Sequence, residues 1–260
     1  MNRWLCSAIL GAAAIGASEA QPVIDFRQFA YHQRTGSAIP AGAVFRDAED
    51  RPVRLADVGH GAPVILVPAY FRCPNLCGVV RASLFGALRP LALTAGRDYV
   101  LAVLSVDPGE TESDARAAKA RDVASFGVPG ADRDWRYLTG RAEDIQAVAD
   151  AIGLRDRVDP DTKQILHPAG VVFLTPGGIV SNYLLGVGYR PAQVRSALER
   201  AGAGEVAAAG APLLLLCFHF DPTTGRYTLE VLKVIRLAAA LTLATIVGSL
   251  WLLFRRERAA

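Results

Sequence analysis

Short apolar runs alternate with segments of helical periodicity through the middle of the chain. Residues 63–70 (PVILVPAY) and 98–107 (DYVLAVLSVD) are continuously apolar at their centres, which is typical of strands buried on both faces. Residues 76–91 and 111–127 predict helices. Because strands alternate with helices, the pattern predicts an α/β sheet with crossover connections.

The same alternation extends to both sides of this centre. Thr111 or Ser113 is expected to cap the second helix. The further expected elements are a hairpin at 43–58, a strand at 135–140, a helix at 141–154, two strands joined by a Pro-Gly-Gly turn at 167–185, a helix at 190–202 and a short strand pair at 213–235. The returning strand at 167–185 adds an antiparallel edge to the sheet.

Both ends of the chain carry signals for export and membrane attachment. Residues 1–20 combine Arg3, a short apolar stretch and small residues before Gln21, which predicts a secretory signal peptide. Residues 237–254 hold no charge and are followed by RRER, which predicts a transmembrane helix with its C-terminal end in the cytoplasm. The Arg-rich, Lys-poor composition favours a bacterium, so we expect an inner-membrane protein whose main domain faces the periplasm.

The expected division of the chain is set out in six parts. They are a signal peptide at 1–20, a lead-in at 21–40, the main domain at 41–203, a linker and short strand pair at 204–235, a transmembrane helix at 236–255 and a cytoplasmic tail at 256–260. The net charge of +3 comes from the two ends, so the exported body is close to neutral. No basic patch favours binding to nucleic acid.

Two cysteines follow the apolar run at residues 63–70. Cys73 and Cys77, in YFRCPNLC, stand where a strand gives way to a helix, and Pro74 suits a first helical turn. One helical turn separates the thiols, so they can point the same way and come within disulfide reach. A dithiol in this position can exchange electrons, hold a metal or form a structural disulfide, although a disulfide closing so small a loop would stabilise little.

A histidine and the order of the expected elements help to decide between these roles of the dithiol. Strand, dithiol, helix, strand, helix, hairpin, helix is the order of a thioredoxin-like fold, although periodicity alone does not single it out. In that arrangement the loop before the strand at 167–185 lies beside the dithiol, and His167 opens that strand. Two thiolates and an imidazole suit copper, and Zn(II) would accept the same set with a fourth ligand. Alternatively, His167 is a structural histidine that bonds a nearby carbonyl.

The sequence resembles the Sco/SenC copper chaperones, which serve the CuA site of cytochrome c oxidase. The resemblance covers roughly residues 40–203 and rests on YFRCPNLC, LSVDP, LHPAGVVFLTPGG and the combination of export with a membrane anchor. It implies a thioredoxin-like α/β fold, a mixed sheet flanked by helices, to which the sequence pattern itself adds an N-terminal hairpin and a C-terminal transmembrane helix. It also implies a copper site formed by Cys73, Cys77 and His167.

The function implied by this resemblance is that of a membrane-anchored periplasmic metallochaperone. It would carry Cu(I) or Cu(II) to an apo-cuproprotein, a cytochrome c oxidase subunit, without covalent substrate chemistry and so without being an enzyme in the strict sense. Phe71, Gly78, Pro168 and the C-terminal anchor depart from the family pattern and indicate a divergent branch. The alternative is a thiol–disulfide oxidoreductase, which would not need His167. A peroxidase would need an arginine fixed beside the thiol, and Arg72 is expected to run along the chain instead.

Three further residues are candidates for the same chemistry. Asp107 ends the second buried strand and is either a group that orients His167 or faces a partner, or the start of a turn before Pro108. Cys217 and His219 alternate with Phe218, so they share one face of an expected strand and are possible extra ligands. The simpler interpretation of this pair is a buried cysteine and a half-exposed histidine.

Overall fold

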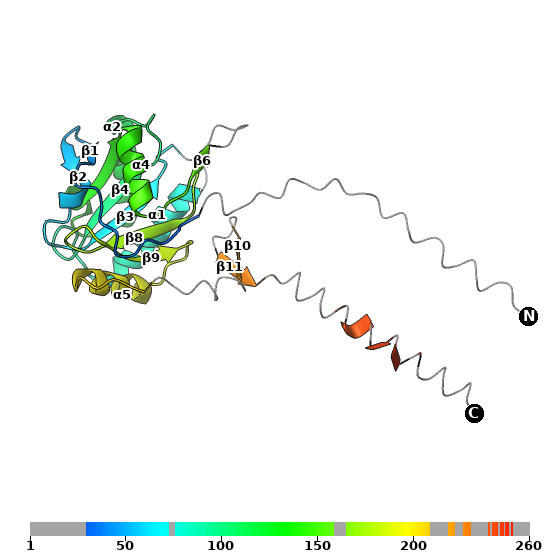
Figure 1. Cartoon of the computed structure of the whole chain (residues 1–260). Coiled ribbons are helices and arrows are strands. Elements are labelled where there is room, and N and C mark those ends of the chain that lie inside the picture. The colour runs from blue at the N-terminus through cyan, green and yellow to red at the C-terminus, as the bar shows by residue number, and fades with distance from the viewer. Residues whose placement is uncertain are drawn as a thin grey trace, which may run out of the picture.

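The computed structural model describes most of the chain between residues 30 and 229. The described residues are 30–72, 76–158, 165–208, 218–221, 226–229, 239, 241–243, 245, 246, 248, 249 and 251. The packed body lies between residues 30 and 208 (Figure 1). The expected signal peptide lies outside the described residues, and the expected span at 237–254 is described only in part. Within the described residues, no helix is both long enough and apolar enough to cross a membrane.

A seven-stranded mixed sheet forms the centre of the body. Its strands are β1 (Val44–Arg46), β2 (Pro52–Arg54), β3 (Val64–Ala69), β4 (Val100–Ser105), β5 (Trp135–Gly140), β8 (Gly170–Leu174) and β9 (Val180–Leu185). They lie in the order β2-β1-β5-β4-β3-β8-β9. β3, β4 and β5 are parallel, β8 and β9 extend the sheet antiparallel on one side, and the β1–β2 hairpin extends it on the other.

Helices cover both faces of this sheet. They are α1 (Leu76–Leu88), α2 (Glu112–Phe126), α3 (Ala131–Asp134), α4 (Ala142–Ala151) and α5 (Pro191–Gly202). Apolar side chains of α1, α2 and α5 share one core cluster with Ile65 and Val67 of β3. Those of α4 and the β1–β2 hairpin share a second cluster with Val64 and Leu66. β3 therefore buries alternate side chains on opposite faces, which explains its continuously apolar sequence. Figure 1 shows α5 lying alongside β9, the outer strand.

The elements expected from the pattern are confirmed. The hairpin at 43–58, the strands at 63–70, 98–107 and 135–140, and the paired strands within 167–185 are all present. Thr111 caps α2, and its side chain and that of Asp114 form a capping box. The expected strand pair at 213–235 corresponds to β10 (Phe218–Asp221) and β11 (Arg226–Leu229), which are antiparallel. The sequence did not predict α3 or the short pair β6 (Arg157–Val158) and β7 (Ile165–Leu166).

The segments before β1 and after α5 both bond to the outer strand β9. The backbone N–H of Gly36 donates to Val180 O at 2.8 Å, and the N–H of Ala207 donates to Ser181 O at 2.9 Å. Unpaired strand edges are open to pairing with other chains, and these two segments occupy part of this edge.

Candidate dithiol and metal site

The candidate site lies at one edge of the sheet, where β3 and β4 end and β8 begins; we call this the dithiol edge. β3 and β4 are parallel and paired through Ala69 and Ser105, so their carboxyl ends lie together. β8 is antiparallel to β3, with Leu66 paired to Val172. Its first residues therefore lie at the same edge, which is where α/β sheets form their binding sites.

The described residues on either side of the dithiol segment lie at this edge of the sheet. β3 ends at Ala69, and α1 begins at Leu76, so Cys77 is the second residue of the helix. Cys73 and the side chain of Cys77 lie outside the described residues. β8 begins at Gly170, so His167 does not open this strand as expected but lies three residues before it, and the ladder of β3 with β8 ends at Leu66 and Val172.

His167 is half-buried and follows β7 directly. Its Nδ1 lies 3.2 Å from Pro168 O. This contact suits the Nδ1–H tautomer, and it is the bond to a nearby carbonyl that the structural interpretation of His167 predicted. Within the described residues no three His, Cys, Asp or Glu side chains form a possible metal cluster, so the ligand set of Cys73, Cys77 and His167 remains a prediction.

A buried carboxylate that the sequence did not indicate holds the chain just before Cys73. The side chain of Glu110 is fully buried and accepts hydrogen bonds from the backbone N–H groups of Phe71 and Arg72, at 2.9 and 2.6 Å. The hydroxyl of Ser105 donates to the same carboxylate at 2.7 Å. Glu110 follows a glycine in a polar loop, so the sequence resembled a solvated turn. The one available signal was its place just beyond the end of a buried strand.

Arg72 points toward the loop after β4. Its Nη2 lies 3.1 Å from both Asp107 Oδ2 and Gly109 O, and its Nε lies 3.6 Å from Glu110 Oε1. Burial lowers the pKa of Arg72, but the hydrogen bond to Asp107 and the nearby carboxylates raise it overall. The guanidinium is therefore charged and engaged by the loop after β4.

Asp107 lies at the dithiol edge and takes part in two local contacts. Its Oδ1 accepts the backbone N–H of Gly109 at 2.8 Å, as in a turn, and its Oδ2 accepts from Arg72. Asp107 thus connects the loop after β4 to the residue before Cys73. A direct role beside His167 remains a prediction.

The structure does not describe the side chains of the two further ligand candidates. Cys217 lies outside the described residues, and so does the side chain of His219. The backbone of His219 belongs to β10 and pairs with Thr228 of β11. Their role as extra ligands is therefore still a prediction.

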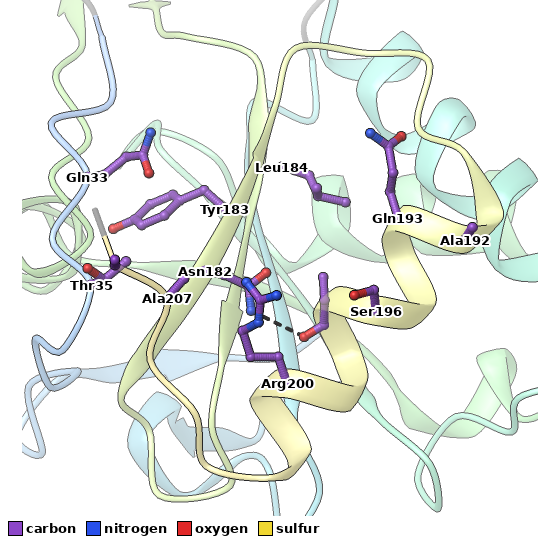
Figure 2. Close-up of a pocket in the computed structure, with 12 residues that line it drawn as sticks. Gln33, Thr35, Asn182, Tyr183, Leu184, Ala192, Gln193, Ser196, Arg200 and Ala207 are labelled. Atoms are coloured by element: carbon purple, nitrogen blue, oxygen red, sulfur yellow. Dashed lines mark hydrogen bonds between the residues drawn. The ribbon is translucent and has the colours of Figure 1, made fainter. Parts of the chain in front are cut away.

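A pocket of about 470 Å³ opens elsewhere, beside β9 and α5 (Figure 2). Its described lining comes from these two elements and from residues 33–35 and 207–208. Asn182 points from β9 toward α5 and donates to Ala197 O at 3.2 Å. Tyr183 and Gln193 of the lining also have partners within the protein, the first donating to Ile152 O at 3.0 Å and the second accepting from Arg190 N–H at 3.1 Å.

Comparison with known proteins gives matches at the level of structure. No family model matches the chain, and no curated protein matches it either. A candidate electron transfer protein from Aquifex aeolicus VF5 superposes with a TM-score of 0.57 at 27% identity, covering 66% of this chain and 96% of that one.

Two Sco proteins also superpose on the same part of the chain. BsSco, a member of the Sco family of cytochrome c oxidase assembly proteins, has a TM-score of 0.51 at 18% identity over 66% of this chain and 97% of its own. A SCO1/SenC family lipoprotein from Bacillus anthracis str. Ames has a TM-score of 0.53 at 18% identity over 66% and 99%. The described body therefore has the mixed, thioredoxin-like α/β fold that these Sco proteins have, with its sheet flanked by helices.

Proposed function

We propose that this protein is a copper chaperone that delivers copper to a cuproprotein, a subunit of cytochrome c oxidase, during assembly. The observation that supports the proposal is the antiparallel pairing of β8 with β3, because the residues that precede β8, among them His167, and the residues that follow β3 toward Cys73 leave the sheet at the same edge. The fold shared with Sco proteins, one of them described as acting in cytochrome c oxidase assembly, supports the same function.

Copper is the cargo in this proposal. The thiolates of Cys73 and Cys77 and the imidazole of His167 supply three donors of the kind that copper prefers. Each thiol loses its proton as it binds the metal, and the N-terminus of α1 favours the thiolate form. Transfer then proceeds by ligand exchange. Thiolates or imidazoles of the recipient replace these donors one at a time, the oxidation state of copper is unchanged, and the released thiolates regain protons.

The location proposed for this activity is the periplasmic side of a bacterial inner membrane. The sequence patterns at 1–20 and 237–254 support it. Attachment to the membrane that holds the recipient raises the effective concentration of the two partners, which favours transfer without a large docking surface.

Copper binding by the reduced full chain tests the proposal. We expect one copper per chain under anaerobic loading. Cys73→Ser and His167→Ala should weaken binding at least tenfold in competition with a chelator, because each removes a ligand. His32→Ala is the matched control, since His32 is an exposed histidine on the segment before β1. Equal copper affinity in His167→Ala and wild type would contradict the proposed site.

The second candidate function is thiol–disulfide exchange. The position of Cys77 in the first turn of α1 supports it, because a helix N-terminus favours the nucleophilic thiolate form. One thiolate attacks a partner disulfide, a mixed disulfide forms, and the second thiolate releases it. The partner leaves as a dithiol, and Cys73 and Cys77 are left oxidised.

The two functions differ in their need for His167. An oxidoreductase should reduce a peptide disulfide at a nearly unchanged rate after His167→Ala, whereas Cys73→Ser should abolish the reaction. A chaperone should lose copper transfer after either change.

A further inference from the structure

We propose that Glu110 is a positioning residue that sets the geometry of the dithiol by holding the two backbone amides before Cys73. This inference deepens the proposed function, because it concerns how the same site brings its two sulfur atoms together. It rests on contacts among described residues.

The first observation is the burial of Glu110. The residue is 5% exposed, and its side chain has no exposed surface. A buried carboxylate is costly unless it is paired and hydrogen-bonded. Glu110 meets this need with three short hydrogen bonds, from Phe71 N–H, Arg72 N–H and Ser105 Oγ, and with Nε of Arg72 at 3.6 Å.

The second observation is where these donors lie along the chain. Ala69 still accepts a ladder hydrogen bond from Val106 at 2.8 Å. Beyond it the strand has ended, and the N–H groups of Phe71 and Arg72 both bond to Glu110 instead of to a strand. The carboxylate therefore takes the place of a neighbouring strand for the last two residues before Cys73.

The third observation is that Phe71 is also fixed from its side chain. Its ring is buried, and its centroid lies 5.8 Å from that of Tyr137 on β5. Only three residues separate Arg72 from Leu76, where α1 begins. Because the chain is fixed at both ends of so short a connection, we expect the Glu110 hydrogen bonds to restrict where Cys73 can lie relative to Cys77.

The expected consequence concerns both the copper chelate and the disulfide. Each requires the two sulfur atoms to be held close together, so each depends on the effective concentration of one sulfur atom at the other. Releasing the amides of Phe71 and Arg72 should lower this effective concentration. Copper binding and disulfide formation should therefore weaken together.

The test compares Glu110→Gln with wild type in the full chain. The glutamine keeps the size of the side chain, but its amide nitrogen cannot accept from a backbone N–H. We expect copper affinity to fall at least tenfold. We also expect the equilibrium with glutathione to shift at least tenfold toward the dithiol, about 30 mV for a two-electron couple.

Three further variants separate positioning from general stability. Glu110→Asp keeps the charge but shortens the reach, and should lie between wild type and Glu110→Gln. Ser105→Ala removes one donor to Glu110 and the contacts of its hydroxyl with the backbone of Asp107, but it leaves the hydrogen bonds from Phe71 and Arg72 in place and should have a smaller effect on copper affinity. Glu112→Gln is the matched control, because Glu112 accepts from Thr139 at 3.3 Å rather than from the dithiol segment.

The outcomes are distinct. A fall in melting temperature with unchanged copper affinity and unchanged glutathione equilibrium in the folded protein would overturn the inference, since it would show a purely structural role. If wild type binds no copper, the proposed function fails, and the glutathione equilibrium alone decides the role of Glu110.

Discussion

At the scale of single residues, a second buried carboxylate joins two helices to the sheet. Asp122 of α2 accepts from Arg81 Nε of α1 at 2.7 Å and from the hydroxyl of Tyr137 at 2.6 Å. Burial, followed by the charge of Asp122, raises the pKa of Tyr137 well above its ordinary value, so the phenol stays a donor. All three residues are at least nine-tenths buried, and the ring of Tyr137 also touches Phe71.

Removing the charge of Asp122 should therefore be costly. We expect Asp122→Ala to lower the free energy of unfolding by about 3 kcal/mol, because it leaves the Arg81 guanidinium buried without its partner. Urea unfolding measures the change. Asp132→Ala is the control, since Asp132 is exposed in α3 and should cost little. Equal effects of the two changes would contradict this reading of the network.

The residues that the sequence could not predict are those whose role depends on distant contacts. Cys73, Cys77 and His167 were named because a dithiol and a histidine stand at matching points in the expected order of elements, and because the sequence resembles the Sco/SenC family. Glu110 was missed because glutamate is common in exposed loops. One of the hydrogen-bond donors that allow it to be buried, the N–H of Phe71, lies 39 positions earlier in the chain. The orientation of the Arg72 side chain was also not predicted, since it depends on the contacts of the guanidinium with Asp107 and Gly109.

At the scale of elements, the tight turn between β1 and β2 is built on Asp47. Its Oδ1 accepts the backbone N–H groups of Glu49 and Arg51 at 3.0 and 2.9 Å, and its Oδ2 accepts from Arg51 Nε at 2.9 Å. Burial raises the pKa of Asp47, but these hydrogen bonds together lower it below its ordinary value. The ionised form is thus the one that the folded hairpin favours.

This shift gives the stability a pH dependence of known sign. The folded pKa of Asp47 lies below the unfolded value of about 3.9, so its stabilisation is present above about pH 4 and is lost as pH falls through the folded pKa. We expect wild type to lose stability in this acidic range more steeply than Asp47→Asn in urea unfolding. Asp50→Asn, at an exposed turn position with φ of 63°, should follow the wild-type slope.

Helix α1 offers a stabilising change. Gly86 is exposed in the interior of this helix, and a Cβ added there would meet nothing within 4 Å. We expect Gly86→Ala to raise the free energy of unfolding by about 1 kcal/mol, because it removes the entropic cost of a helical glycine. Thermal unfolding measures it, and an unchanged or lowered midpoint would count against the prediction.

Most of the helices and strands could be predicted from the sequence, because burial of one or both faces requires apolar residues at regular positions. β3 and β4 are apolar throughout, since both of their faces are covered. β6 and β7 have two residues each, too few to show any periodicity.

At the scale of the whole molecule, the segment before β1 packs against the strand that begins after His167. A Cβ on Gly170 would come within 2.9 Å of Tyr31 Cε2 and 3.0 Å of Leu185 Cδ2. We expect Gly170→Ala to destabilise the fold by about 1–3 kcal/mol through overpacking. Urea unfolding beside Gly86→Ala gives a matched pair, the same substitution with opposite expected signs. A neutral Gly170→Ala would show that Tyr31 moves freely.

The position of β8 has a consequence for how this protein folds. β8 pairs directly with β3, although β4, β5, the short pair β6–β7 and the four helices α1 to α4 lie between them in the chain. Such a contact forms only after a long loop has closed, which makes it a late and slow event in folding. An incompletely folded chain would present its cysteines without its histidine. If the protein binds copper as proposed, copper binding would therefore show that the pairing of β8 with β3 has formed.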